Sequence, residues 1–261
     1  MNADILLERD IDDPRIAVVT LFNPDKLNAL NAAMWSRLAA AFEEISADNH
    51  LRCVVVRGEG RVFAAGGDLE EFLTARDTIG RAVAYHETVG RALAAVERCP
   101  IPTVAQILGP CVGGGLEIAA ACDLRIAGQS ARFGAPIARL GFSMYPGEMS
   151  GLLRLAGPAV LKEILLEGRL LDAGEAHAKG LVTRVVADAD VEGETRETVA
   201  RIAAGAPLVA RWHKQWIARL LEGRPLTDEE KRDAFAFLDS EDYREGLTAF
   251  LEKRAPAFKG R

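Results

Sequence analysis

Three consecutive glycines, Gly113 to Gly115, separate an apolar segment from an alanine-rich one. The apolar run over 102–108 predicts a strand, and the residues from Gly114 to Cys122 predict a helix. The first N–H groups of a helix have no partner within it, and the helix dipole favours negative charge there. Glycines leave this backbone open because no Cβ blocks a ligand. The segment therefore predicts an anion-binding turn between a strand and a helix.

Glu117 lies three residues after Gly114, so a helix places both on one face. An oxyanion site beside a carboxylate is suited to stabilising an enolate and moving a proton. The alternative is a simple glycine turn in which Glu117 stabilises the helix dipole. This segment alone does not decide between the two interpretations.

A second loop of small residues, Arg61 to Asp68, follows a β-branched run at 53–56. Ligands in α/β proteins bind at the carboxyl ends of strands, which is where this loop is predicted to lie. The alternative is a tight turn closed by Asp68 as the N-cap of a helix that begins at Leu69.

The two loops together resemble those of the crotonase superfamily, the enoyl-CoA hydratase/isomerase family, in which two peptide N–H groups bind a thioester oxygen. This resemblance implies Ala65 and Gly114 as the donors and Glu117 as the acid or base. Three further segments are similar to the family in the expected order. They are 23–31 (a CoA-contacting loop), 121–134 (the strand and turn after the oxyanion helix) and 241–254 (the closing helix).

The resemblance also implies an architecture and an assembly. We expect an α/β fold, with a crotonase-like spiral of ββα units over 1–200 and a helical C-terminal region over 201–261. In the family this region builds trimers, often paired into hexamers, so a homotrimer or a dimer of trimers is expected.

The hydrophobic pattern of the sequence agrees with an α/β fold. It predicts strands at 16–21, 53–56, 102–108, 124–127 and 181–186, and helices around 34–45, 78–97 and from 152 onward. A capping box is predicted at Thr227–Glu230.

Composition and charge limit the partners. The 261 residues are 49% hydrophobic and 27% charged, as expected for one large domain. A net charge of −6 argues against nucleic acid or an anionic membrane as the main partner. No secretory signal or membrane-spanning run is predicted. Four scattered cysteines without a CxxC motif suit reduced thiols in a cytoplasm and predict no metal site (Cys53, Cys99, Cys111 and Cys122).

Several other enzyme classes lack their motifs in this sequence. No GxGxxG follows a strand, no GK[ST] closes a glycine loop, and no GxSxG is present. A dinucleotide enzyme is therefore disfavoured. By the resemblance, coenzyme A is part of an acyl-CoA substrate, and no separate cofactor is expected.

The sequence departs from the hydratase pattern at one point. Hydratases that resemble this chain carry a second glutamate in a Phe-Gly-x-Pro-Glu context, whereas 133–137 ends in Ile137, which cannot activate water. Water addition needs both a base and an acid, so isomerisation or decarboxylation with a single carboxylate stays open. Tyr145 and Glu148, in the family's variable active-site loop, are candidates for the second role; the alternative is that both are surface turn residues. A CoA-ester-binding protein without catalysis is a further hypothesis.

The resemblance implies a set of CoA- and substrate-binding residues in both loops, beside the oxyanion helix and near the C-terminus: Lys26, Leu27, Asn28, Ala29, Leu30, Ala64, Gly66, Gly67, Asp68, Gly113, Ile137, Phe258 and Lys259. His86, in a helix of mixed polarity, is given no functional role, and Trp212 and Trp216, four residues apart, are expected to pack on a helix face.

Overall fold

The computed structural model describes residues 3–261 and contains two sheets. The larger has the strand order β1 (Asp4–Arg9), β2 (Ile16–Phe22), β3 (Cys53–Gly58), β4 (Thr103–Ile107), β6 (Leu124–Gly128) and β9 (Arg184–Val186). Only β1 runs antiparallel to its neighbour, and the other pairs are parallel. The smaller sheet joins β5 (Pro110–Val112), β7 (Arg132–Gly134) and β8 (Leu171–Asp172).

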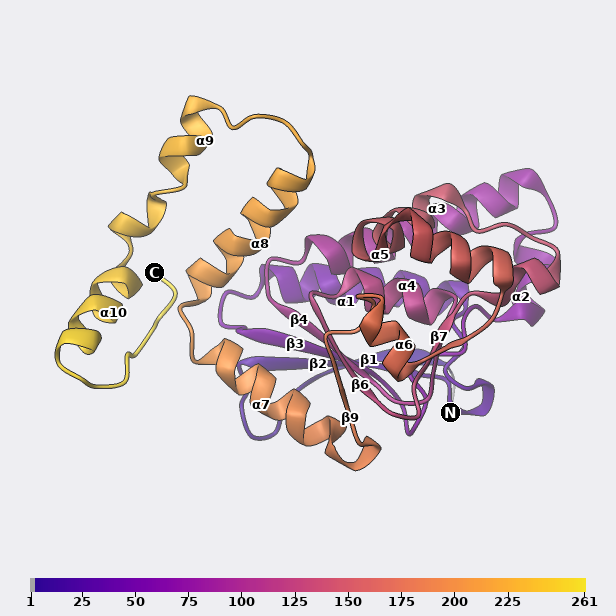
Figure 1. Ribbon diagram of the computed structural model, residues 1–261, viewed down its shortest axis with the longest axis horizontal. Coiled ribbons are helices and arrows are strands. Elements are labelled where there is room, and N and C mark those ends of the chain that lie inside the picture. Colours follow the sequence, from indigo (N-terminus) through magenta and orange to yellow (C-terminus); the bar gives the residue numbers. More distant parts are fainter. Residues whose placement is uncertain (1–2) are drawn as a thin grey trace.

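Helices cover both faces of the larger sheet (Figure 1). On one face α1 (Ala32–Ala47) packs against β1 and β2, and α3 (Ile79–Arg98) packs on α1. On the other face α7 (Val191–Ala203) contacts β3, β4 and β6. Buried side chains such as Val55, Val104 and Val199 fill the space beneath α7. The sheet is therefore buried on both sides, which explains the nearly continuous apolar runs of its strands.

The remaining elements of the core surround the ends of these strands. They are α2 (Leu69–Ala75), α4 (Gly114–Ala121), α5 (Pro146–Glu167), α6 (Ala173–Ala178) and short 3₁₀ turns at Pro24–Lys26, Pro136–Leu140 and Asp188–Asp190. The axis of α5 breaks at Gly157, which has a positive φ and precedes Pro158. Both α3 and α5 pack against α4, so the alanine-rich helix predicted from the sequence lies at the centre of this layer.

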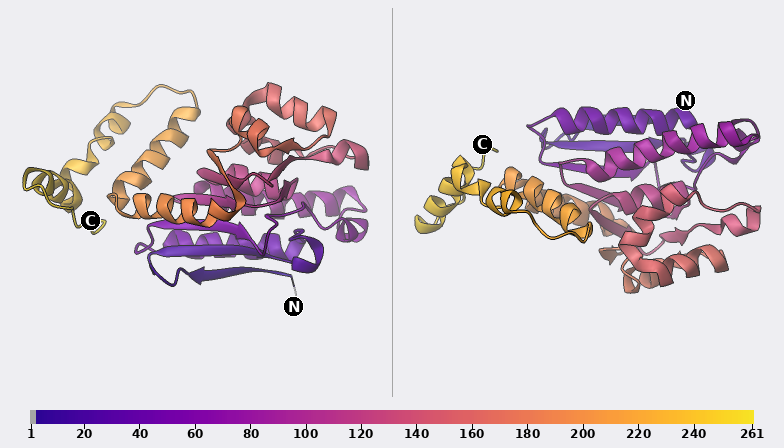
Figure 2. Two further views of the ribbon diagram at one scale, coloured as in Figure 1. Left: turned by 60° about the horizontal axis from the view of Figure 1, so that its bottom comes forward. Right: turned by 90° about the horizontal axis from the view of Figure 1, so that it is seen from above.

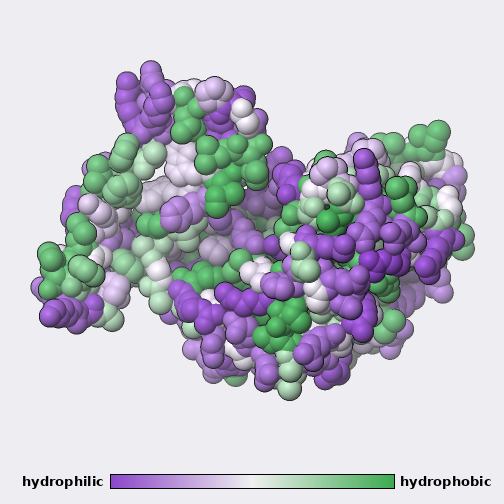
Figure 3. All heavy atoms as spheres, in the orientation of Figure 1, coloured by the Kyte–Doolittle hydropathy of each residue, from purple (hydrophilic) through white to green (hydrophobic). Residues whose placement is uncertain are grey.

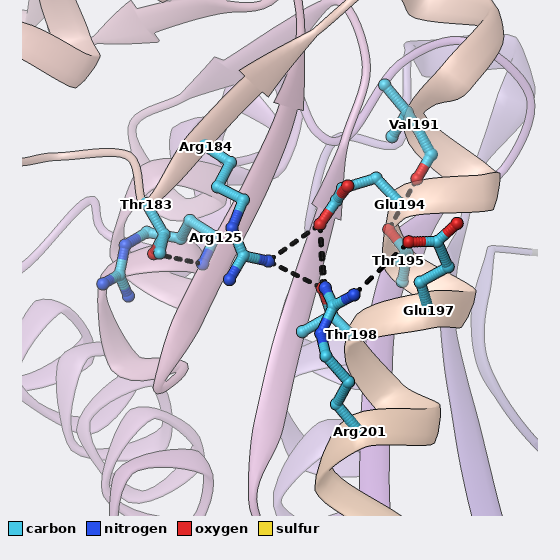
Figure 4. A network of polar contacts seen from close by, with 9 residues as sticks. All are labelled: Arg125, Thr183, Arg184, Val191, Glu194, Thr195, Glu197, Thr198 and Arg201. Carbon is cyan, nitrogen blue, oxygen red and sulfur yellow. Dashed lines mark hydrogen bonds and ion pairs between the residues drawn. The ribbon is translucent and has the colours of Figure 1, made fainter.

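A polar network joins the last strand of the sheet to α7 (Figure 4). Arg184 of β9 donates to the Glu194 carboxylate at 2.9 Å and to the Thr198 hydroxyl at 2.7 Å. Arg201 donates to the same two oxygens at 3.0 and 2.8 Å. Two guanidinium groups thus share one carboxylate, which fixes α7 against the sheet edge.

The C-terminal helices extend from one end of the core (Figures 1 and 2). They are α8 (Pro207–Leu221), α9 (Asp228–Asp233) and α10 (Glu241–Leu251), with a 3₁₀ turn at Ala236–Asp239. The predicted capping box opens α9: the Thr227 hydroxyl accepts from the Glu230 N–H at 3.1 Å, and the Glu230 carboxylate accepts from the Thr227 N–H at 2.7 Å. None of the helices within residues 3–261 is both long and apolar enough to cross a membrane.

Most predicted elements are present, with two corrections. The strand predicted at 102–108 does not lead directly into the glycine turn, because the short strand β5 lies between them. The strand predicted at 181–186 is limited to β9, since Leu181 and Val182 are buried ahead of it and Thr183 donates to the Arg125 carbonyl at 3.0 Å. The four cysteines are free and buried.

The segment around Ala64 lies against the first turn of α4 at very close range. A Cβ on Gly115 would lie 2.7 Å from the Ala64 carbonyl oxygen and 2.9 Å from the Ala64 Cβ. A Cβ on Gly114 would lie 2.8 Å from the Trp35 ring. A side chain at Gly115 would displace backbone and one at Gly114 would displace the Trp35 ring, so packing as well as ligand access favours glycine at both positions.

We expect Gly115→Ala to destabilise the protein by about 1–3 kcal/mol, because the added methyl group overpacks a backbone contact. The matched control is Gly90→Ala in α3, where an added Cβ meets nothing within 4 Å. The control should gain about 0.5–1 kcal/mol from helix propensity. Urea unfolding of both variants measures the difference. Equal stability of the two variants would contradict the packing role of Gly115.

Candidate active site

A cavity of about 440 Å³ opens at the carboxyl ends of the central strands, between the Ala64 segment, α2, α3, α4 and the start of α5. Its wall contains four glycines, three glutamates and a group of aromatic side chains. The residues that line it are Lys26, Ala29, Trp35, Ala65, Gly66, Gly67, Asp68, Leu69, Glu70, Phe72, Arg76, Tyr85, His86, Val89, Val112, Gly113, Gly114, Glu117, Pro136, Ile137, Leu140, Phe142, Ser143, Met144, Tyr145 and Glu148.

The N-terminus of α4 lies on this wall. Gly113 precedes the helix with a φ of 50°, and its N–H donates to the Gly134 carbonyl at 2.8 Å. Gly114 is the first residue of α4, and within residues 3–261 its N–H has no acceptor. The opposite end of the helix is closed by the buried Arg125, which donates to the carbonyl oxygens of Ala119 (3.1 Å) and Cys122 (2.5 Å). The guanidinium thus compensates the negative end of the dipole and leaves the positive end toward the cavity.

The Ala64 segment is held by backbone hydrogen bonds along both edges. The Ala64 N–H donates to Pro110 on one side at 2.9 Å, and on the other the Ala65 N–H donates to the Leu27 carbonyl at 3.0 Å. This corrects the prediction for Ala65: its N–H is already paired and is not available to a ligand. On either side of Gly67, the Gly66 carbonyl accepts from the Leu30 N–H and the Asp68 N–H donates to the Leu30 carbonyl, both at 2.8 Å.

Gly67 supplies the available donor instead. Gly67 and Leu30 form an isolated parallel β-bridge. The neighbours of Gly67 make both hydrogen bonds to Leu30, so Gly67 directs its own N–H to the opposite side. The Gly67 N–H has no acceptor within the described part of the chain, and Gly67 and Gly114 line the same cavity. The structure therefore brings two unpaired peptide N–H groups to one wall.

Glu117 lies one helical turn into α4 and is 8% exposed. Burial, and to a smaller extent the nearby Glu148 carboxylate, raise the pKa of Glu117 well above its usual range. Its carboxyl group forms no hydrogen bond with residues 3–261, so both oxygens are free for a ligand. A buried, unpaired carboxyl group with a raised pKa suits general acid–base work near neutral pH.

A second carboxylate reaches the cavity from the start of α5. Glu148 is 8% exposed, and its Oε1 lies 2.5 Å from Nδ1 of His86 on α3. The Tyr145 ring stacks on the His86 ring, with centroids 4.9 Å apart. Tyr145 and Glu148 thus both line the cavity, although Tyr145 is also 40% exposed to solvent.

Comparisons with known proteins identify the family. Residues 13–261 match the model of the enoyl-CoA hydratase/isomerase family. A relative from Mycobacterium bovis named "Probable enoyl-CoA hydratase" is 36% identical over 260 residues, which is 98% of each chain. The chain belongs to the enoyl-CoA hydratase/isomerase family.

Solved structures agree with this result. A crystal structure of an enoyl-CoA hydratase/carnithine racemase from Magnetospirillum magneticum is 49% identical, covers 100% of this chain and 97% of its own, and has a TM-score of 0.96. The enoyl-CoA hydratase of Bacillus anthracis is 30% identical, with coverage of 98% and 99% and a TM-score of 0.89. These matches confirm the predicted crotonase-like α/β fold with C-terminal helices and the predicted enzyme family. Membership of the family implies binding of an acyl-CoA.

The predicted binding residues divide into three groups. Seven of them line the cavity: Lys26, Ala29, Gly66, Gly67, Asp68, Gly113 and Ile137. Lys26 is not a free cation, since its ammonium group contacts the carboxylates of Asp68 (2.8 Å) and Glu70 (2.7 Å), which raise the pKa of Lys26. Asp68 is also the predicted N-cap of α2, because its side chain accepts from the Glu70 N–H at 3.1 Å.

Four other predicted residues support the cavity from behind. Asn28 is buried and donates through Nδ2 to the carbonyls of Glu59 (3.0 Å) and Val62 (2.7 Å). Leu30 and Ala64 are fully buried, and Leu27 is exposed with a left-handed backbone. None of the four lines the cavity. Their role in the structure is to shape the loops.

The structure places Phe258 and Lys259 away from the cavity of their own chain. Phe258 lies with Trp212 and Trp216 in a hollow between α8 and α10, and its carbonyl accepts from Arg52 at 3.2 Å. The Lys259 N–H donates to Asp242 at 2.7 Å. The prediction that they contact CoA is therefore wrong within one chain, because the C-terminal helices turn away from the core (Figure 1).

Several residues of the site carry no signal in the sequence. The sequence pattern gives His86 no functional role and does not single out Phe72, Arg76, Tyr85 or Phe142. The Arg76 guanidinium lies 4.2 Å from the Phe72 ring centroid and 4.7 Å from that of Phe142, and all three side chains line the cavity. No local sequence signal relates His86 to a residue 62 positions away. Within residues 3–261 no three potential metal ligands form a group that could hold an ion.

We expect Glu117→Gln to stabilise the fold at high pH. Because the folded state raises the pKa of Glu117, it binds this proton more tightly than the unfolded state. The resulting stability is full below the unfolded pKa and is lost as pH rises through the folded pKa. Each tenfold difference in proton affinity between the two states corresponds to about 1.4 kcal/mol. Gln matches the neutral acid, so the variant should equal the wild type near pH 4 and exceed it at pH 8–9.

Urea unfolding across this pH range measures the effect. Glu87→Gln, at an exposed position of the neighbouring helix α3, is the control and should stay within about 0.5 kcal/mol of the wild type throughout. A constant difference between Glu117→Gln and the wild type at all pH values would refute the assigned titration.

Proposed function

We propose that this enzyme converts an acyl-CoA through a thioester enolate, as a hydratase or isomerase of its family. The observation that supports this proposal is the position of Glu117. It is a buried carboxyl group with both oxygens free, one turn from an unpaired helix N-terminal N–H. The thioester oxygen accepts hydrogen bonds from the N–H groups of Gly67 and Gly114, and Glu117 transfers the proton at Cα or Cβ.

The chemistry follows from where charge develops. Removing an α-proton, or adding a nucleophile at Cβ, moves an electron pair onto the thioester oxygen. Each preorganised donor aimed at that oxygen is worth about 3–4 kcal/mol in comparable oxyanion holes. The dipole of α4, undiminished at this end, adds to the effect. The apolar wall formed by Phe72, Phe142 and Val89 takes the acyl chain and excludes water.

Ile137 favours a second candidate function that uses the same enolate chemistry, namely isomerisation or decarboxylation without addition of water. It lines the cavity where the hydratases resembling this chain carry a glutamate, and its side chain neither donates nor accepts a proton. Double-bond isomerisation, or decarboxylation to the enolate, needs only the oxyanion donors and one carboxyl group.

The first functional test is exchange of the α-proton. The wild type, incubated with butyryl-CoA in D₂O, should incorporate deuterium at Cα, as measured by mass spectrometry. Glu117→Gln should lower the exchange rate by about 10²-fold or more, because general acid–base catalysis contributes that much. Glu87→Gln is again the control and should exchange like the wild type. Absence of exchange in the wild type, or full exchange in Glu117→Gln, would refute the enolate proposal.

We also propose that α8–α10 mediate trimer formation, with pairing of trimers as the alternative. Large apolar side chains are exposed along these helices, among them Leu221 (65%) and Phe250 (82%). Hydrophobic surface gathers on the extended helices (Figure 3). Exposed apolar surface of this kind marks an interaction site.

Analytical ultracentrifugation tests the assembly. The wild type should sediment as a trimer or hexamer, and the double variant Leu221→Asp/Phe250→Asp should shift toward monomer because two charges would be buried at the interface. Ile79→Asp, at an exposed apolar residue of α3, is the control and should leave the mass unchanged. A monomeric wild type would overturn the proposal.

A further inference from the structure

The contact between Glu148 and His86 has features that a simple packing contact does not require. Both side chains are about nine-tenths buried, and both line the cavity that holds Glu117. They come from α5 and α3, 62 residues apart in the chain. Nδ1 of His86 contacts Oε1 of Glu148 at 2.5 Å, whereas Oε2 has no hydrogen-bond partner within residues 3–261. One oxygen is therefore held by protein and the other is free for a molecule in the cavity.

The His86 ring is itself held on two sides. Tyr145 stacks on it at an interplanar angle of 17°, and Tyr85 contacts it edge-on with centroids 5.6 Å apart. The imidazole has little freedom to rotate, so its contact fixes the position of the Glu148 carboxylate. Besides the two tyrosines, the other ionisable side chains that line the cavity are Lys26, Asp68, Glu70, Arg76 and Glu117.

A role in holding α3 and α5 together does not by itself account for the contact between His86 and Glu148. The two helices are already joined at the surface by an ion pair between Glu97 and Arg154. Burying polar groups costs free energy unless their hydrogen bonds are satisfied, and Oε2 of Glu148 has no partner within residues 3–261. Polar groups retained at such a cost in a cavity, with one oxygen unpaired, indicate a role toward a ligand.

We propose that Glu148 is the base that activates water for addition to a 2-enoyl-CoA, and that His86 is the residue that positions it. This inference rests on the proposed enolate chemistry and selects hydration from the reactions that remained open. Glu148 thus performs, from α5, the role that Ile137 cannot perform from the turn after β7.

The proposed hydration adds water across the Cα–Cβ double bond of the 2-enoyl-CoA. Glu148 accepts a proton from water while the water oxygen forms a bond to Cβ. The π electrons of the Cα–Cβ double bond move to the thioester oxygen, where the N–H groups of Gly67 and Gly114 stabilise the enolate. Neutral Glu117 then donates its proton to Cα and the thioester carbonyl re-forms. The product is a 3-hydroxyacyl-CoA, and exchange of one proton at each carboxyl group resets the pair. Burial and the nearby Glu148 carboxylate both raise the pKa of Glu117, which favours the neutral form that donates this proton.

Two assays distinguish the role of Glu148 from that of Glu117. Hydration is followed as incorporation of ¹⁸O from labelled water into crotonyl-CoA, and enolate formation as α-deuterium exchange of butyryl-CoA. We expect Glu148→Gln to lower kcat for hydration by about 10²-fold or more with KM changed less than about threefold, while α-exchange stays within about threefold of the wild type. Glu117→Gln should lose both reactions. Glu97→Gln, which breaks the surface pair between the same two helices, should lose neither.

The role of His86 is tested by two replacements of different chemistry. Gln retains an N–H donor and should preserve most of the hydration rate, whereas His86→Leu should lower kcat for hydration by about 10-fold or more and leave α-exchange intact. A structural role alone would reduce both reactions together and would not be rescued by Gln.

Three results would overturn the inference. The first is a wild type that exchanges α-protons but does not hydrate, which leaves the enolate proposal standing with a single carboxylate. The second is Glu148→Gln that hydrates at the wild-type rate. The third is parallel loss of exchange and hydration in Glu148→Gln. A wild type that fails to exchange refutes the enolate proposal instead, and with it the basis of this one.

Discussion

The site depends on one steric constraint: the first turn of α4 and the segment around Ala64 lie closer than any side chain permits. The missing Cβ of Gly115 lets the Ala64 carbonyl approach, and the missing Cβ of Gly114 leaves room for the Trp35 ring. This approach brings the N–H groups of Gly67 and Gly114 to one cavity. Both backbones are held rigidly, the helix by Arg125 at its far end and the loop by hydrogen bonds along both edges. The donors are therefore preorganised before any ligand arrives.

Two glutamates of the cavity, Glu117 and Glu148, differ in their surroundings: one is buried without a hydrogen-bond partner within residues 3–261, and the other contacts a histidine. Glu117 lies within the apolar layer of α3, α4 and α5 without a counter-ion, so its neutral form is favoured. Glu148 contacts an imidazole that two tyrosine rings hold in place. Two residues of the same type thus lie in different surroundings on one wall. In the proposed reaction they supply an acid and a base to a single substrate.

Much of the fold could be predicted because it is encoded in local patterns. The spacing of Met34, Leu38 and Phe42 predicts α1, and Thr227 with Glu230 predicts the start of α9, since helix faces and caps depend on residues three or four apart. The N–H of Ala65, predicted to be a free donor, is paired, and the unpaired N–H in the described loop lies two residues later, at Gly67. Which N–H in that loop is unpaired depends on the partners Leu27 and Leu30, which lie more than 30 positions away. The position of Phe258 depended on the direction of the C-terminal helices, which local patterns do not specify.

The sequence by itself determined the chemistry that one segment can carry: a glycine turn that starts a helix, with Glu117 on the same face, is set by residue type and spacing. It also determined that position 137 offers no carboxylate. Only the tertiary structure decided that Gly67 supplies the second N–H, that Glu117 is buried, and that His86 meets Glu148 across two helices. The physical reason is that hydrogen-bond pairing, burial and contact between distant helices depend on which surfaces pack together, and that packing is a property of the whole chain.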